Sequence, residues 1–120
     1  MGRFRDALSG HGLRSIAEIK RRSPSAGDLR PDADPAVLAA AYERAGAAAV
    51  SILVDARFGG SWDDLRAARA AAGVPLLAKG FFSTEDDLRT AGEAGADATL
   101  LIPRDLDDGT CARLLRAAAE

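Results

Sequence analysis

The stretch Ile16-Ala17-Glu18-Ile19-Lys20-Arg21-Arg22-Ser23-Pro24-Ser25-Ala26-Gly27 joins a short apolar run to a polar loop. Residues two apart along a strand point to the same face, so Glu18 and Lys20 project together near the end of a first strand. The loop that follows is longer than a minimal connection. Its serine, proline and glycine residues suit a loop that approaches a ligand closely, although an ordinary surface loop has the same composition.

Short apolar runs alternate with longer helical patterns along the rest of the chain. Runs of strand length occupy 15–20, 48–54, 75–79 and 98–102, and helical patterns occupy 34–46, 62–72, 84–94 and 108–119. Helices between consecutive strands imply parallel strands joined by right-handed crossovers. We therefore predict one α/β domain over residues 1–120 with four βα units. Two architectures fit: a small open doubly-wound sheet, or half of a (β/α)8 barrel.

The predicted helices carry recognisable start and stop signals. The expected N-terminal caps are Asp34 before Pro35, Ser61 with Asp64 at the capping-box position, Ser83-Thr84-Glu85-Asp86, and Asp107-Asp108. Gly46, Gly73 and Gly95 are each expected to end a helix in the left-handed conformation.

Composition excludes several classes of protein. The chain has 120 residues, 48% of them hydrophobic and 28% charged, with 16 basic against 18 acidic side chains. These values argue against a disordered chain, a collagen-like repeat and a basic nucleic-acid binder. No apolar run approaches the ~18 residues needed to span a bilayer, and Met1–Asp6 has no apolar signal-peptide core. A single cysteine, Cys111, cannot form an internal disulfide, so we expect a cytoplasmic protein.

The lysines are conspicuous because there are so few of them. The basic residues comprise 14 arginines and only two lysines, Lys20 and Lys79, and both lysines stand at predicted strand ends. Ligands of parallel α/β folds bind at the carboxyl ends of the strands. A lysine can lose its proton in a dry pocket whereas an arginine cannot, so a proton-donating role requires lysine. The structural alternative is a Glu18–Lys20 ion pair that caps the sheet, with Lys79 solvated.

Aromatic side chains are expected at the same rim. Phe58-Gly59-Gly60-Ser61 follows the second predicted strand, and Phe81-Phe82 follows the third. These rings either sandwich an aryl substrate or fill the top of a barrel.

The first of these motifs resembles the first-strand signature of indole-3-glycerol phosphate synthase, the ring-closing enzyme of tryptophan biosynthesis. The motifs that carry the resemblance are, in order, Ile16–Gly27, Tyr42-Glu43-Arg44-Ala45-Gly46-Ala47, Val50-Ser51-Ile52-Leu53-Val54, Phe58-Gly59-Gly60-Ser61, Pro75-Leu76-Leu77-Ala78-Lys79 and Gly95-Ala96-Asp97-Ala98-Thr99-Leu100-Leu101-Ile102. The similarity runs from about Phe4 to Glu120.

The resemblance implies a (β/α)8 barrel that acts as a lyase. Its reaction converts 1-(2-carboxyphenylamino)-1-deoxyribulose 5-phosphate to indole-3-glycerol phosphate, with release of carbon dioxide and water. No metal or organic cofactor is implied. By the same analogy, Lys79 is the general acid at the ketose carbonyl. Lys20 holds the anthranilate carboxylate and assists ring closure, and Glu18 positions these groups. Ser23 contacts the substrate, while Phe58 and Phe81 flank its aromatic ring.

Three departures from the family pattern affect these expectations. The chain has four βα units where the family has eight, so the catalytic glutamate of the fifth strand, further polar groups and the phosphate site have no counterpart. Gly80 stands where the family usually has an aspartate that helps to orient the third-strand lysine. The N-terminal helical segment is reduced to about ten residues.

Half a barrel leaves two apolar strand edges, at Ile16–Ile19 and Leu100–Ile102, and such edges pair readily with other strands. We therefore expect a homodimer or a complementary half-barrel chain to complete the barrel. The main alternative is a non-catalytic half-barrel module or fragment derived from the enzyme. Weaker alternatives are another sugar-phosphate barrel and a flavodoxin-like signalling domain. The latter would need acidic residues for metal binding at the strand ends, and Asp55 at the end of the second strand is one acidic residue in such a place.

Overall fold

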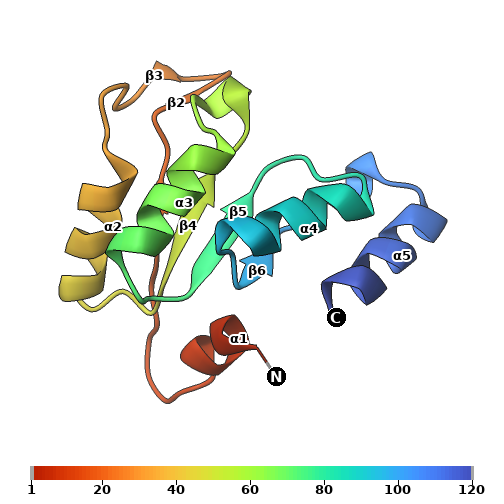
Figure 1. The fold of residues 1–120 in the computed structure, drawn as a ribbon, viewed down its shortest axis with the longest axis horizontal. Coiled ribbons are helices and arrows are strands. Elements are labelled where there is room, and N and C mark those ends of the chain that lie inside the picture. Colours follow the sequence, from red (N-terminus) through yellow and green to blue (C-terminus); the bar gives the residue numbers. More distant parts are fainter. Residues whose placement is uncertain (1, 120) are drawn as a thin grey trace.

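Four parallel strands form the sheet of this computed structural model, which describes residues 2–119. The sheet strands are β1 (Ile16–Ile19), β4 (Ala49–Leu53), β5 (Leu76–Lys79) and β6 (Ala98–Thr99). The α-helices are α1 (Arg3–Leu8), α2 (Pro35–Arg44), α3 (Trp62–Ala71), α4 (Glu85–Ala94) and α5 (Asp108–Ala118). Two short 3-10 helices, η1 (Ala56–Phe58) and η2 (Pro103–Asp105), follow β4 and β6 (Figure 1).

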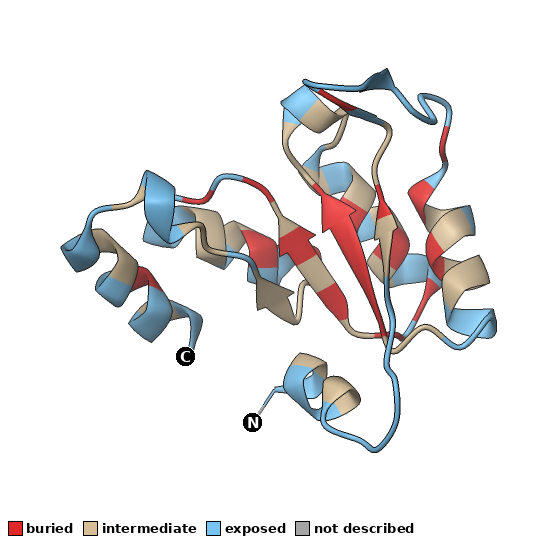
Figure 2. Cartoon of the chain, turned by 180° about the vertical axis from the view of Figure 1, so that it is seen from behind, coloured by how far each residue is buried: buried red, intermediate tan, exposed pale blue. Residues whose placement is uncertain are grey.

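The strand order decides between the two architectures that the sequence left open. The order is β1-β4-β5-β6, so each strand lies beside the next strand of the sheet along the chain. In a doubly-wound sheet the first strand lies inside the sheet and later strands add on both sides of it, whereas a barrel adds its strands in chain order. The helices α2, α3 and α4 also lie together on one face of the sheet, and the view from behind shows the other face of β4 and β5 without them (Figures 1 and 2). This arrangement is that of a partial barrel.

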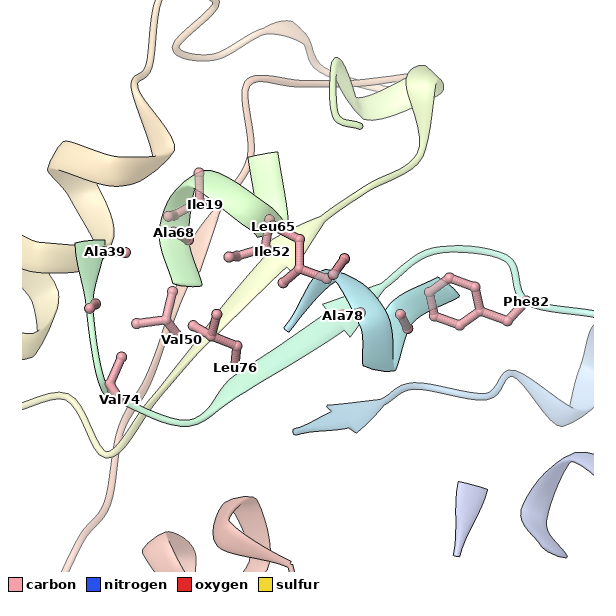
Figure 3. Close-up of a cluster of buried hydrophobic side chains, with 13 residues drawn as sticks. Ile19, Ala39, Val50, Ile52, Leu65, Ala68, Val74, Leu76, Ala78 and Phe82 are labelled. Carbon is pink, nitrogen blue, oxygen red and sulfur yellow. The ribbon is translucent and has the colours of Figure 1, made fainter. Parts of the chain in front are cut away.

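The core lies between the sheet and these helices. Val50, Ile52 and Leu76 point from β4 and β5 toward Leu65 and Ala68 of α3, and all five side chains are fully buried (Figure 3). Complete burial of a Val, Leu or Ile side chain contributes about 1.5–3 kcal/mol, so this layer supplies much of the stability. Every residue of β4 is buried, in agreement with its sequence, which is apolar except for Ser51.

Most of the predicted helix signals are confirmed. Asp34 accepts a hydrogen bond from the Ala36 amide at 3.0 Å. Capping boxes join Ser61 to Asp64 and Thr84 to Asp87, and Asp107 accepts from the Thr110 amide. Gly46 and Gly95 have φ of +96° and +110°. The prediction for Gly73 was wrong, because Gly73 is not left-handed. Helix α3 ends at Ala71, and the chain then continues through extended backbone at Ala72.

Two further details differ from the sequence-based expectation. The last strand pairs only at Ala98–Thr99, because residues 100–102 leave the ladder after the Leu100 amide donates to Ala78 O. The loop after β1 contains a small antiparallel hairpin, β2 (Arg22–Ser23) with β3 (Gly27–Asp28), which the polar composition did not predict.

A clamp around Arg69 ties the elements together at the amino ends of the strands. The Arg69 guanidinium donates hydrogen bonds to Ala72 O, Val74 O, Gly95 O and Asp97 Oδ2 at 2.7–3.2 Å. Asp97 Oδ2 also accepts from the Leu76 amide at 3.0 Å, and Arg3 of α1 pairs with Asp97 Oδ1. The clamp therefore joins α1, α3, β5 and the turn before β6.

No helix within residues 2–119 combines the length and apolar character needed to cross a bilayer.

Candidate active site

Glu18 lies between both lysines at the carboxyl ends of the strands. Lys79 Nζ, at the last residue of β5, donates to Glu18 Oε1 at 2.9 Å. Lys20 Nζ, just after β1, lies 3.5 Å from Glu18 Oε2. The three side chains are half-buried. The alternative in which Lys79 is merely solvated is therefore wrong, because one carboxylate holds both ammonium groups, one on each oxygen.

Ser51 adds a neutral donor to this cluster. It is the register partner of Glu18 across β1 and β4, and its hydroxyl donates to Glu18 Oε1 at 3.2 Å. The same oxygen thus accepts from Ser51 and Lys79. Ser51 was not predicted to have a role, although a hydroxyl inside the apolar run of β4 is a signal that a polar partner faces it.

The charges around Glu18 set its protonation. Burial acts to raise the pKa of Glu18, but the hydrogen bond and charge of Lys79, the charge of Lys20 and the hydrogen bond from Ser51 outweigh it and hold the pKa below the ordinary value of 4.5. Glu18 is therefore a carboxylate at neutral pH. A carboxylate flanked by two ammonium groups can orient proton donors, and the ammonium groups can bind an anion.

The rim aromatics form one stacked pair. The rings of Phe58 and Phe81 lie 6.1 Å apart between centroids, with an interplanar angle of 20°. Lys20 Nζ lies 5.9 Å from the centroid of the Phe58 ring. The pair therefore borders the charged cluster as a single aromatic shelf. A planar ligand between the two rings would need a wider separation, so it must lie against the shelf or part it.

Arg57 covers part of this shelf. Its guanidinium lies 3.9 Å from the centroid of Phe81 and pairs with Asp55 through Nε at 2.9 Å. Asp55 also accepts from the Arg57 amide at 2.8 Å and begins η1 as its N-cap. Asp55 is therefore paired with an arginine. The sequence carried no signal for Arg57, because arginine is abundant throughout the chain.

The loop after β1 is fixed by hydrogen bonds. Arg21 donates to Ala33 O, to Gly59 O and to both oxygens of Asp64. Ser23 is buried, and its hydroxyl accepts from the Ala26 amide at 3.0 Å inside the β2–β3 hairpin. This loop is therefore an ordered wall beside the site.

The absence of a side chain at Gly80 leaves room for the ring of Phe82. A Cβ atom at Gly80 would lie 3.1 Å from Phe82 Cε1 and 3.4 Å from Val54 Cγ2. Phe82 is buried there and stacks on Trp62 with centroids 5.9 Å apart. The position after Lys79 thus presents no carboxylate, and the neighbouring volume belongs to the core.

A hollow of about 460 Å³ lies next to Phe81, lined by Arg57, Phe81, Phe82, Ser83, Ile102, Arg104, Asp105 and Leu106. A second, of about 640 Å³, lies between α4, α5 and β6, away from the charged cluster. Within residues 2–119, no group of three or more His, Cys, Asp or Glu side chains is arranged to hold a metal ion. His11 is exposed and Cys111 is a free thiol.

The structure brings together five of the six predicted site residues. Glu18, Lys20 and Lys79 form the charged cluster, and Phe58 and Phe81 form its aromatic border. Ser23 lies in the adjacent wall, with its hydroxyl turned into its own hairpin.

Known proteins match most of this chain. The family model described as indole-3-glycerol phosphate synthase matches residues 2–120. Proteins of that name from Micrococcus luteus and from a Nocardioides species are 52% identical over 106 residues and 51% identical over 110 residues. These alignments cover 88% and 91% of this chain but 40% and 42% of the relatives. The chain thus spans about two fifths of the length of the curated relatives that it matches.

Solved structures support the architecture alone. A mandelate oxidase variant with (S)-mandelic acid superposes with a TM-score of 0.61 at 18% identity, covering 99% of this chain and 43% of that one. A mandelate oxidase with 3,3-difluoro-2-hydroxy-3-phenylpropionic acid gives a TM-score of 0.57 with the same coverage. At this identity the likeness concerns the fold, and it agrees with a partial barrel.

Proposed function

This chain belongs to the indole-3-glycerol phosphate synthase family, and we propose that it supplies the amino-terminal four βα units of a (β/α)8 lyase. The proposed reaction closes the indole ring of 1-(2-carboxyphenylamino)-1-deoxyribulose 5-phosphate and releases carbon dioxide and water. The observation that carries the proposal is the cluster in which Glu18 holds Lys79 at 2.9 Å and Lys20 at 3.5 Å. This cluster supplies the proton donors and the anion partners that the substrate requires.

Lys79 is the proposed general acid. Its ammonium donates a proton to the oxygen of the ketose carbonyl as the aryl ring attacks that carbon, so the developing alkoxide is neutralised as it forms. Glu18 orients the ammonium through the hydrogen bond at Oε1. Loss of carbon dioxide restores aromaticity to the aryl ring. The hydroxyl formed from the ketose carbonyl then takes up a proton and leaves as water, and the neighbouring methylene carbon loses a proton, which forms the double bond that completes the indole.

Lys20 is the proposed partner of the anthranilate carboxylate. It pairs with Glu18 at 3.5 Å, a longer contact than that of Lys79, and it lies beside the Phe58 ring. A cation next to an aromatic face suits a ligand that carries a carboxylate on an aryl ring. Phe58 and Phe81 are proposed to flank that ring, and Ser23 is proposed to contact the substrate once its loop adjusts.

The proposal includes completion of the barrel. Ile16 of β1 is 44% exposed and Leu100, just after β6, is 38% exposed, although both are large apolar side chains. Each of these strands pairs on one side only within the described residues. A second copy of the chain or a complementary half-barrel chain would cover these edges and the open face of the sheet. We further propose a cytoplasmic location, on the ground that Cys111 is the chain's one cysteine.

The test is turnover of the carboxyphenylamino-ribulose phosphate, followed by indole fluorescence. We expect Lys79→Ala to lower kcat about 10²–10⁴-fold. Lys79→Arg should not rescue it, because a guanidinium retains its proton. Arg116→Ala, an exposed change on α5, is the matched control and should keep full activity.

Turnover that survives in Lys79→Ala would contradict the assignment of Lys79. A folded, assembled sample with neither turnover nor binding of the substrate would favour the alternative, a non-catalytic half-barrel module derived from the enzyme. Gly80, in place of the family's aspartate, is the specific observation behind that alternative.

A further inference from the structure

Ser51 is a polar side chain in an otherwise apolar position. It lies in the middle of β4, is 2% exposed, and has Val50 and Ile52 as neighbours. A buried hydroxyl without a hydrogen bond destabilises the fold, whereas one that donates to a carboxylate is satisfied. The partner of Ser51 is Glu18 Oε1, at 3.2 Å. The position is therefore explained by the carboxylate that it faces.

The register of the sheet places Ser51 and Glu18 side by side on neighbouring strands. Ser51 pairs with Glu18 on one side and with Leu77 on the other, and Lys79 follows Leu77 on the same face two residues along β5. Ser51 Oγ and Lys79 Nζ converge on the same atom, Glu18 Oε1. The charged groups that face Glu18 are Lys79 from β5 and Lys20 from the end of β1, and β4 contributes only the hydroxyl.

Because residue 80 is a glycine, no side chain at that position can help to orient Lys79. Phe82 and Val54 occupy the space that a side chain at position 80 would need. Among residues 2–119, the ion pair of Lys79 is with Glu18. The orientation of the lysine therefore follows the orientation of one carboxylate.

We propose that Ser51 is a positioning residue, which fixes the carboxylate of Glu18 and through it the ammonium of Lys79. This inference deepens the proposed function and rests on it for its catalytic meaning. Ser51 touches Glu18, not the substrate. With the hydroxyl removed, Oε1 is held by Lys79 alone, and the carboxylate can rotate toward either lysine.

The first test measures Glu18 in the chain itself, without any substrate. A hydrogen bond to the charged form lowers a carboxyl pKa, so Ser51→Ala should raise the pKa of Glu18. A carbon-13 NMR titration of the side-chain carboxyl measures this rise. Ser83→Ala, an exposed serine in the loop after β5, is the matched control and should leave the titration unchanged. A Glu18 pKa that is the same in Ser51→Ala and in the parent chain would overturn the proposal.

The second test is a double-mutant cycle on the assembled enzyme. Ser51→Ala should lower kcat about fivefold to tenfold with KM changed less than twofold, since it alters orientation and not binding. In a Glu18→Gln background the same change should have little further effect, because residues that act through one another are not additive. Additive losses in the cycle would also overturn the proposal.

The two tests separate this inference from the proposed function. A rise in the Glu18 pKa with no turnover in any variant supports the positioning role and contradicts the lyase. Where Ser51→Ala does not fold, Ser51→Cys keeps a weak donor at the same place, and a smaller rise of the Glu18 pKa is expected. An unchanged pKa in a folded Ser51→Cys protein counts against the proposal.

Discussion

Glu18 is the side chain that connects the polar residues of the candidate site. It accepts hydrogen bonds from Ser51 and Lys79 on one oxygen and faces Lys20 with the other. A lone carboxylate in this half-buried position would be poorly solvated, and two lone ammonium groups would repel each other. The opposite charges therefore stabilise one another. All three groups are available to a ligand that enters at the carboxyl ends of the strands.

This arrangement predicts how acid affects stability. Because the folded pKa of Glu18 lies below the ordinary 4.5, its contribution is complete above pH 4.5 and is lost as the pH falls through the folded pKa. Glu18→Gln should therefore reduce the loss of unfolding free energy between pH 7 and pH 3, by roughly 0.5–1 kcal/mol. Urea unfolding at both pH values measures it.

Glu93→Gln, an exposed change on α4, is the control and should retain the acid sensitivity of the parent chain. An unaltered pH dependence in Glu18→Gln would show that the ion pairs of Glu18 do not stabilise the fold.

At the scale of the element, Asp64 links the start of α3 to the loop after β1. Its carboxylate accepts from the Ser61 amide at 3.1 Å and from Arg21 Nη2 at 3.1 Å, and its side chain is 14% exposed. Arg21 in turn holds the carbonyls of Ala33 and Gly59. One helix cap thus anchors two loops at the rim of the site.

Asp64→Asn should lower the unfolding free energy by roughly 1–3 kcal/mol, because it weakens the cap and leaves Arg21 short of a charged partner. Asp63→Asn is the matched control: it lies in the same first turn, is 89% exposed and pairs only across the helix surface with Arg66. Its cost should stay below about 1 kcal/mol. Equal midpoint shifts for the two variants in thermal unfolding would contradict the linking role of Asp64.

The elements show where sequence reasoning succeeds and where it fails. The apolar run at β4 and the caps at Asp34 and Thr84 are local signals, and the structure confirms them. The error at Gly73 arose because α3 leaves the helix through extended backbone, so no left-handed residue is needed. The β2–β3 hairpin depends on pairing across a turn with little apolar content, which periodicity does not detect.

The site was predicted by the same kind of local evidence. The spacing of Glu18 and Lys20 placed them on one face, and the scarcity of lysine drew attention to Lys79. The contact between Phe58 and Phe81 and the arginine on the Phe81 ring depend on loop conformations after two different strands. Such conformations are set by tertiary packing and leave no pattern in the sequence.

At the scale of the whole molecule, the exposed apolar edges predict association. We expect the chain to form a dimer or a larger species at micromolar concentration, measured by size-exclusion chromatography with light scattering. Ile16→Lys, at the edge of β1, should shift the population toward monomer. Val37→Lys, at an exposed apolar position on α2 in the helix layer, should not. A stable monomer of the parent chain with sharp, native-like spectra would refute this expectation.

The Arg69 clamp lies at the opposite end of the strands from Glu18 and Lys79. Three of the four oxygens that its guanidinium contacts are main-chain oxygens, whose identity does not change with the side chains around them, and the fourth is Asp97 Oδ2. Insertions and loop exchanges at the carboxyl ends of the strands would therefore leave the Arg69 clamp intact. Laboratory evolution toward a new substrate can therefore vary the loops at the carboxyl ends while the residues of the clamp are kept.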